Sequence, residues 1–83
     1  MNDKPLLPGL YIVATPIGNL GDVTLRGLAT LKQADLIACE DTRVTGKLLH
    51  QFGIKTRMTS YHEHNARQKQ DEIMGVLKSG GTV

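Results

Sequence analysis

The stretch Leu10-Tyr11-Ile12-Val13-Ala14-Thr15-Pro16-Ile17-Gly18-Asn19 decides the fold class of this 83-residue chain. Its first five residues form a continuous apolar run rich in β-forming side chains, as in a strand buried on both faces of a parallel sheet. Pro16 ends the run, and Gly18 gives the following turn its freedom. The stretch therefore predicts a buried strand over residues 10–14 that leads into a glycine-containing loop.

The same order of strand, loop and helix recurs twice along the chain. Residues 36–39 form a second apolar run, and residues 55–61 mix polar and apolar side chains as an edge strand does. Residues 82–83 start a further extended segment. The strands expected from the sequence are thus three complete ones and the beginning of a fourth.

A helix is expected after each of the three complete strands. The side chains expected to cap these helices are Asp22 or Thr24, Asp41 or Thr42, and Asn65. The apolar stripes expected on them are Leu25, Leu28 and Leu31, then Val44, Leu48 and Phe52, then Ala66, Ile73, Val76 and Leu77. Gly53 ends the second helix, and Gly80 and Gly81 end the third.

The alternation β-α-β-α-β-α-β predicts an α/β fold with a parallel sheet and right-handed crossovers. We expect residues 1–8 to be a flexible lead-in and residues 9–83 to be an incomplete N-terminal α/β domain. The fourth strand has two residues, against a usual length of about five or six. The sequence therefore predicts an N-terminal fragment of a longer protein.

The composition excludes several classes of protein. Ten Lys and Arg against eight Asp and Glu give a net charge of +2, which fits neither a histone-like polycation nor an acidic tail. The single cysteine, Cys39, allows no internal disulfide. The sequence has neither an apolar run long enough to span a membrane nor a secretory signal, so a cytoplasmic protein is expected.

Polar or glycine-rich segments follow all three complete strands, at residues 15–22, 40–43 and 61–65. Ligands of open α/β sheets bind outside the carboxyl ends of the strands. We therefore expect these segments to meet on one rim of the sheet and to form the functional site. The first segment is neither a dinucleotide fingerprint nor a P-loop, so a nucleotide phosphate has little support there.

Glu40, Asp41, Thr42 and Arg43 bring two carboxylates and a guanidinium to a strand end. Such a cluster can position a hydroxyl group, accept a proton or contact a phosphate. A purely structural interpretation has Asp41 or Thr42 capping the helix while Glu40 pairs with Arg43 on the surface.

His62 and His64 are candidates for a proton acceptor or an RNA contact, with a solvated loop as the alternative. Two imidazoles are too few for a metal site, so no metal is expected. Glu63 would point away from both histidines if the preceding strand continued through it. Cys39 is expected to be a small core residue.

These motifs resemble the tetrapyrrole methylase family, the class III S-adenosylmethionine-dependent methyltransferases. The resemblance lies in residues 10–20, 35–43, 52–54 and 62–65 and runs in order through nearly the whole chain. The pair Thr15-Pro16-Ile17-Gly18-Asn19 and Glu40-Asp41-Thr42-Arg43 is similar to the branch of the family that methylates small-subunit rRNA.

The resemblance implies methyl transfer from S-adenosylmethionine to the ribose 2′-hydroxyl of a cytidine in small-subunit rRNA, usually by a homodimer. It places Pro16 and Gly18 on the cofactor side of a cleft between two α/β domains. It implies Glu40, Asp41, Arg43, His62 and His64 as catalytic candidates, with Thr42 and Asn65 binding substrate. The identity of the base stays open.

The alternatives are a methylase of small tetrapyrroles with the same fold and a non-catalytic binding fragment. Relatives place the fourth strand between the first and second and continue beyond it into a further loop and a second domain. With a fourth strand of two residues, we expect the first strand to lack a neighbour in this chain.

Overall fold

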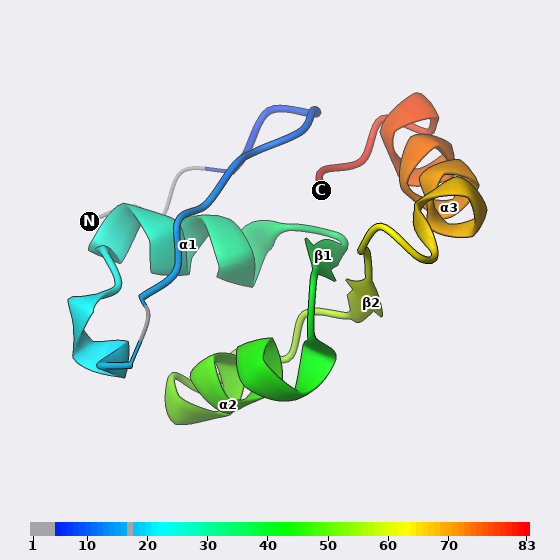
Figure 1. Cartoon of the computed structure of the whole chain (residues 1–83). Coiled ribbons are helices and arrows are strands. Elements are labelled where there is room, and N and C mark those ends of the chain that lie inside the picture. Colours follow the sequence, from blue (N-terminus) through cyan, green and yellow to red (C-terminus); the bar gives the residue numbers. More distant parts are fainter. Residues whose placement is uncertain (1–4, 17) are drawn as a thin grey trace.

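The computed structural model describes residues 5–16 and 18–83, and its helices and strands alternate along the chain (Figure 1). In chain order the elements are η1 (Leu20–Asp22), α1 (Leu25–Gln33), β1 (Ile37–Cys39), α2 (Thr42–Gln51), β2 (Met58–Ser60) and α3 (Ala66–Lys78). The α/β class is confirmed from α1 onward. The short 3-10 turn η1 was not expected. Part of the lead-in and Ile17 lie outside the described residues.

The sheet consists of the parallel strands β1 and β2, with Ile37 opposite Met58 and Cys39 opposite Ser60. The expected edge strand is confirmed in β2, which is shorter than residues 55–61. Thr82 extends the sheet on the other side of β1, where its carbonyl accepts the N–H groups of Asp35 at 3.0 Å and Leu36 at 3.3 Å. The Asp35 carboxylate in turn accepts the Thr82 N–H at 2.9 Å.

The first predicted strand does have a neighbour, so the expectation that it would lack one is wrong over residues 9–11. Gly9 bridges Thr82 in parallel, and the Tyr11 N–H donates to the Val83 carbonyl at 2.8 Å. The spatial order is therefore residues 9–11, residues 81–83, β1 and β2. Two residues of the fourth segment are enough to join the N-terminal segment to the sheet.

Beyond that short ladder, the prediction of a buried strand over residues 10–14 is wrong. No strand is assigned there, and the side chains of Leu10 and Ile12 are 61% and 90% exposed. The apolar run provides strand propensity, but burial also requires surfaces that cover it. Val13 is the residue of this run that packs against the core.

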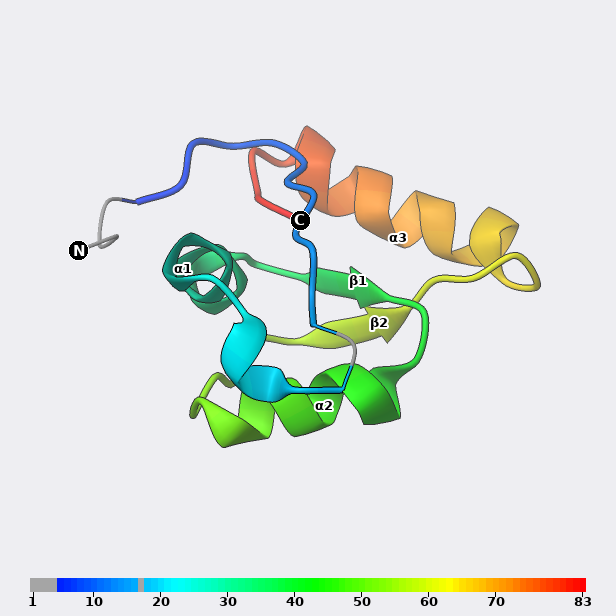
Figure 2. The same ribbon diagram turned by 60° about the vertical axis from the view of Figure 1, so that its left-hand side comes forward.

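The core lies between the sheet and the first two helices. Leu31, Ile37, Leu48, Leu49 and Ile54 form its buried cluster. The stripe predicted for α2 is partly wrong because Val44 is 65% exposed, whereas Leu49, outside that stripe, is buried. Figure 2 shows α2 on one side of the two strands and α3 on the other, as right-handed crossovers in opposite directions require.

Leu36 and α3 lie on the face of the sheet opposite the main core and α2. Leu36 has no exposed surface, and it alternates with Ile37, which faces the main core. The stripe predicted on α3 is half-buried, and no residue of this helix is fully buried. No helix in the described residues is long and apolar enough to cross a membrane.

Glycines end α2 and α3 as predicted. Gly53 and Gly80 have φ angles of 66° and 86°, in the left-handed region that glycine adopts without strain. The N–H of Gly81 then donates to the Val76 carbonyl at 2.9 Å. A Cβ at Gly81 would lie 2.7 Å from the Val76 side chain and 3.0 Å from the Asp35 carboxylate, so this turn allows the Thr82 segment to approach β1 closely.

Candidate active site at the carboxyl ends of the strands

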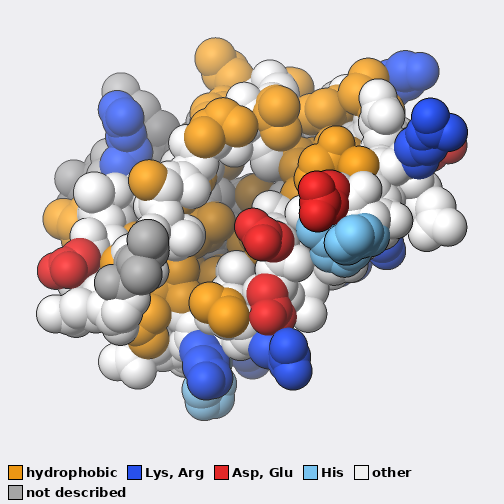
Figure 3. Space-filling view, in the orientation of Figure 1, with side chains coloured by type: hydrophobic (Ala, Val, Ile, Leu, Met, Phe, Trp, Pro, Cys, Tyr) orange, Lys and Arg blue, Asp and Glu red, His pale blue; other side chains and the backbone are white. Residues whose placement is uncertain are grey.

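An open pocket of about 680 Å³ lies where β1 and β2 end. Its lining comes from the two segments that follow these strands and comprises Glu40, Asp41, Thr42, Ser60, His62, Glu63 and His64. Figure 3 shows acidic and histidine side chains grouped near the middle of this face. The second and third polar segments therefore meet, as expected. They meet because parallel strands end at the same edge of the sheet.

Asp41 is the N-cap of α2, as one of the two sequence alternatives proposed. Its Oδ1 accepts the Arg43 N–H at 2.9 Å, and the Arg43 guanidinium lies 3.4 Å from both carboxylate oxygens. The Arg43 N–H, followed by its guanidinium, lowers the pKa of Asp41 below the ordinary value. Asp41 is therefore held as an anion and is a weak proton acceptor.

Glu40 does not pair with Arg43, although the purely structural interpretation of the sequence expected that pair. That pairing is wrong because Arg43 pairs with Asp41, which the N-cap geometry brings close to the first turn of α2. Within the described residues, Glu40 makes neither an ion pair nor a hydrogen bond, and it is exposed on the pocket wall. Its carboxylate is thus free to accept a hydrogen bond or a proton from a ligand.

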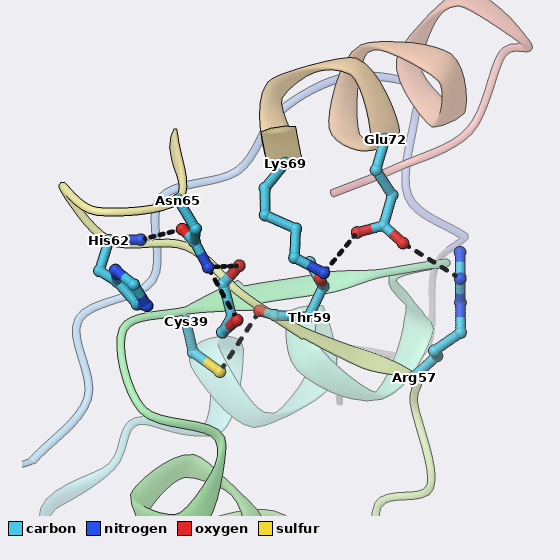
Figure 4. A network of polar contacts seen from close by, with 8 residues as sticks. Cys39, Arg57, Thr59, His62, Asn65, Lys69 and Glu72 are labelled. Carbon is cyan, nitrogen blue, oxygen red and sulfur yellow. Dashed lines mark hydrogen bonds and ion pairs between the residues drawn. The ribbon is translucent and has the colours of Figure 1, made fainter. Parts of the chain in front are cut away.

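Asn65 occupies the N-cap position of α3, but its side chain does not cap the helix, so that prediction is wrong. The side chain instead turns back toward β2 (Figure 4). Its Oδ1 accepts the His62 N–H at 2.9 Å, while its Nδ2 donates to the Ser60 carbonyl at 3.3 Å and to Ser60 Oγ at 3.0 Å. Asn65 thus ties the turn over residues 62–65 to the end of β2.

The same turn brings the histidines and Glu63 to the pocket. The His64 N–H donates to His62 Nδ1 at 3.2 Å, and the two rings stand edge to face with centroids 5.8 Å apart. The expectation that Glu63 points away from the histidines assumed that the strand continues through it, but β2 ends at Ser60 and the chain turns, so that condition is not met. Glu63 Oε1 lies 3.6 Å from His64 Nε2, and both side chains are exposed.

A contact further along α3 connects this helix to Arg57, the residue before β2, and a second one lies within the helix. Glu72 lies 3.7 Å from the Arg57 guanidinium and 3.9 Å from the Lys69 ammonium (Figure 4). Long, partly exposed ion pairs of this kind add little stability. Asn65, with its shorter bonds, is therefore the contact that defines how the turn and α3 leave the sheet.

None of the described residues of the first polar segment, 15–16 and 18–22, lines this pocket. Pro16 is half-buried and Gly18 is exposed with a φ of 92°, and neither residue lines the pocket. Asn19 Oδ1 accepts the Gly21 N–H at 2.9 Å, which orders the start of η1. The structure thus unites two of the three expected segments.

Cys39 is half-buried against the core cluster, as its prediction as a core residue requires, and its thiol lies 3.7 Å from the Thr59 carbonyl oxygen. No three His, Cys, Asp or Glu side chains of residues 5–16 and 18–83 gather closely enough to hold a metal ion.

Ser60 and Glu63 line the pocket, although neither was among the candidate site residues of the sequence. The third strand was expected to continue to Tyr61, which hid Ser60 in its interior. The sequence carries no signal for Ser60; the parallel register of the structure sets it opposite Cys39, the last residue before the Glu40 segment.

Replacing Arg43 with alanine should raise the pKa of Asp41 partway toward its ordinary value of 3.8. The shift should be incomplete because the main-chain N–H of residue 43, the largest cause, remains. Since the folded-state pKa is the lower one, the stabilisation is present above the unfolded pKa and is lost as the pH falls through the folded pKa. Carboxyl carbon NMR during acid titration measures this shift. Lys78→Ala, at the far end of α3, is the control; an unchanged Asp41 pKa in Arg43→Ala would contradict the assignment.

Comparison with known proteins assigns the family. Residues 9–83 match the Tetrapyrrole (Corrin/Porphyrin) Methylases, so the chain belongs to this family. Within it, the chain is similar to proteins named ribosomal RNA small subunit methyltransferase I. It is 55% identical to the one from Mesorhizobium japonicum over 80 residues, which cover 96% of this chain and 27% of that protein.

Two further relatives carry the same name. The protein from Neisseria meningitidis serogroup A is 57% identical over 74 residues, covering 89% of this chain and 25% of the relative. The protein from Streptococcus pyogenes serotype M3 is 53% identical over 81 residues, covering 98% of this chain and 28% of the relative. The chain therefore spans about a quarter of the length of the relatives that it matches.

Proposed function

We propose that this chain forms the N-terminal part of an S-adenosylmethionine-dependent methyltransferase that modifies the ribose 2′-hydroxyl of a cytidine in small-subunit rRNA. The observation that carries the proposal is the pocket at the ends of β1 and β2, in a chain more than half identical to relatives named for small-subunit rRNA methylation. We also propose that the full-length protein has a second α/β domain and forms a homodimer.

The residues present fit one property of the cofactor, which is its positive charge. Glu40, Asp41 and Glu63 line the pocket, and the Arg43 guanidinium offsets the charge of Asp41 only, so the pocket wall keeps a negative charge that favours a cation. When bound, the cofactor supplies a sulfonium methyl group that is transferred as the sulfur leaves as a neutral thioether. Pro16 and Gly18, outside this pocket, are proposed to contact the cofactor from the first loop.

The pocket residues are proposed to hold the ribose and remove its proton. A hydroxyl group is a poor nucleophile, so transfer requires alignment and a proton acceptor. Glu40 is the carboxylate best placed to accept that proton because Arg43 engages Asp41 and Glu63 lies beside His64. Thr42 and Ser60, which both line the pocket, can donate to sugar or base oxygens, and Arg43 beside them can contact a phosphate.

The test is methyl transfer by the full-length protein, with labelled S-adenosylmethionine and either unmodified small ribosomal subunits or a tetrapyrrole as acceptor. We expect label in the rRNA, at a ribose. Glu40→Gln should lower kcat by roughly a hundredfold, the lower range for loss of a general base. Asp71→Asn, on an exposed part of α3, is the matched control and should retain activity.

Labelled tetrapyrrole with unlabelled rRNA would reject the proposed substrate in favour of the alternative family activity. Full activity of Glu40→Gln on rRNA would retain the substrate and reject Glu40 as the proton acceptor. The melting temperature of each variant separates these outcomes from loss of folding.

A further inference from the structure

The orientation of the His62 ring follows from two hydrogen bonds made by main-chain groups. The His62 N–H is held by Asn65 Oδ1 at 2.9 Å, and the His64 N–H donates to His62 Nδ1 at 3.2 Å. Figure 4 shows the Asn65 side chain directed at the His62 main chain from the start of α3. The first bond fixes the backbone of the turn, and the second fixes the ring within it.

The second bond also determines which ring nitrogen carries the proton. A nitrogen that accepts an N–H must offer a lone pair, so Nδ1 is unprotonated and a neutral His62 has its proton on Nε2. Turning the ring over by 180° would present a carbon-bound hydrogen to the His64 N–H and lose this hydrogen bond, so the bond favours the orientation described. In this arrangement the Nε2–H of His62 is a hydrogen-bond donor.

We propose that His62 serves the reaction as a hydrogen-bond donor to an oxygen of the bound nucleotide rather than as the proton acceptor, and that Asn65 is the residue that positions it. The inference rests on the proposed function and changes the roles that the sequence implied, where His62 was a candidate base and Asn65 bound substrate. His62 lines the pocket together with the unpaired carboxylate of Glu40. The pocket would then present a donor and an acceptor to one ligand, each from a different strand end.

Asn65 suits a positioning role because its side chain is already engaged. Its Oδ1 and Nδ2 are bonded to His62 and to Ser60 at 2.9 to 3.3 Å. A side chain bonded in this way stabilises the turn rather than contacting a substrate. Aspartate at this position would keep the acceptor for the His62 N–H but lose the donor to Ser60.

The first experiment reads the tautomer directly and does not depend on activity. The full-length protein is labelled with nitrogen-15 histidine, and long-range proton–nitrogen NMR at alkaline pH distinguishes a protonated from an unprotonated ring nitrogen. His62→Gln identifies the His62 signals by their loss. We expect Nε2 to be protonated and Nδ1 to be unprotonated; protonation of Nδ1 would overturn the proposal even if the protein methylates rRNA.

Two variants control this measurement. His64→Ala removes the second imidazole but keeps the main-chain N–H, so the His62 tautomer should be unchanged. Asn65→Ala removes the tether and should let both tautomers appear, whereas Asn65→Asp should retain more of the Nε2–H form. A tautomer that is unaffected in Asn65→Ala would reject Asn65 as the positioning residue.

The second experiment separates a donor from a base in the reaction. His62→Gln keeps an N–H donor near the position of Nε2 but cannot relay a proton as imidazole does. We expect it to retain most of kcat, with an unchanged pH–rate profile, while His62→Ala loses roughly tenfold to a hundredfold. If His62→Gln is as impaired as His62→Ala, or if the acidic limb of the profile disappears in both, His62 is the proton acceptor and the proposal is wrong.

Discussion

Calorimetric titration of this 83-residue chain with S-adenosylmethionine should give no binding at micromolar cofactor, and the chain alone should methylate nothing. The pocket is an open surface formed by the ends of two strands, whereas small-molecule sites usually enclose most of their ligand. Pro16 and Gly18 do not line it. The chain also spans about a quarter of the relatives' length.

The full-length protein is the matched control and should bind the cofactor under the same conditions. Circular dichroism and an unfolding curve establish that the chain is folded in the titration. Micromolar binding by a folded monomer of the chain would show that the described residues complete the cofactor site, against our account. Binding by a dimer alone would place the missing contacts in a second copy.

Leu36→Ala should cause the largest loss of stability of any single change considered for this chain. Leu36 is the one large side chain with no exposed surface among the described residues, and it lies between the sheet and the α3 side. Removing a buried leucine side chain typically costs about 2–5 kcal/mol through lost burial and the cavity left behind. A chain of this length has a total stability of about 4–12 kcal/mol, so the variant should lose a large share of it and unfold at a much lower urea concentration than the parent chain.

Leu25→Ala is the control because it makes the same chemical change on a side chain that is 79% exposed. Its urea midpoint should differ little from that of the parent chain, with a change in free energy of roughly 0.5 kcal/mol or less. Equal midpoints for the two variants would mean that the α3 side of the sheet is not packed as described.

The sequence determined the features that depend on near neighbours. Patterns a few residues long predicted the alternation of helices and strands from α1 onward and the glycine ends of α2 and α3. They limited the cap of α1 to Asp22 or Thr24 and that of α2 to Asp41 or Thr42. The meeting of the Glu40 and His62 segments was also predictable, because parallel strands joined by helices must end at one edge. These signals are local, or they follow from topology alone.

Tertiary structure decided which of these residues face one another. Arg43 could have paired with either carboxylate, and the helix start brought it to Asp41. Asn65 is a residue type that often caps helices. Here its Oδ1 accepts the His62 N–H and its Nδ2 donates to Ser60, whereas the first turn of a helix offers only N–H donors. The end of β2 at Ser60, rather than the periodicity of the sequence, brought Glu63 to the pocket.

The apolar run over residues 10–14 shows most clearly what the sequence alone did not determine. Strand propensity in residues 10–14 is a property of the side chains, but their burial depends on what packs on both faces, and here Leu10 and Ile12 remain exposed. Conversely, Thr82 enters the sheet through hydrogen bonds to Asp35, 47 positions earlier in the chain. Local sequence patterns therefore predict conformation over a few residues. Contacts between segments far apart in the sequence, such as Asp35 with Thr82, depend on how the whole chain packs.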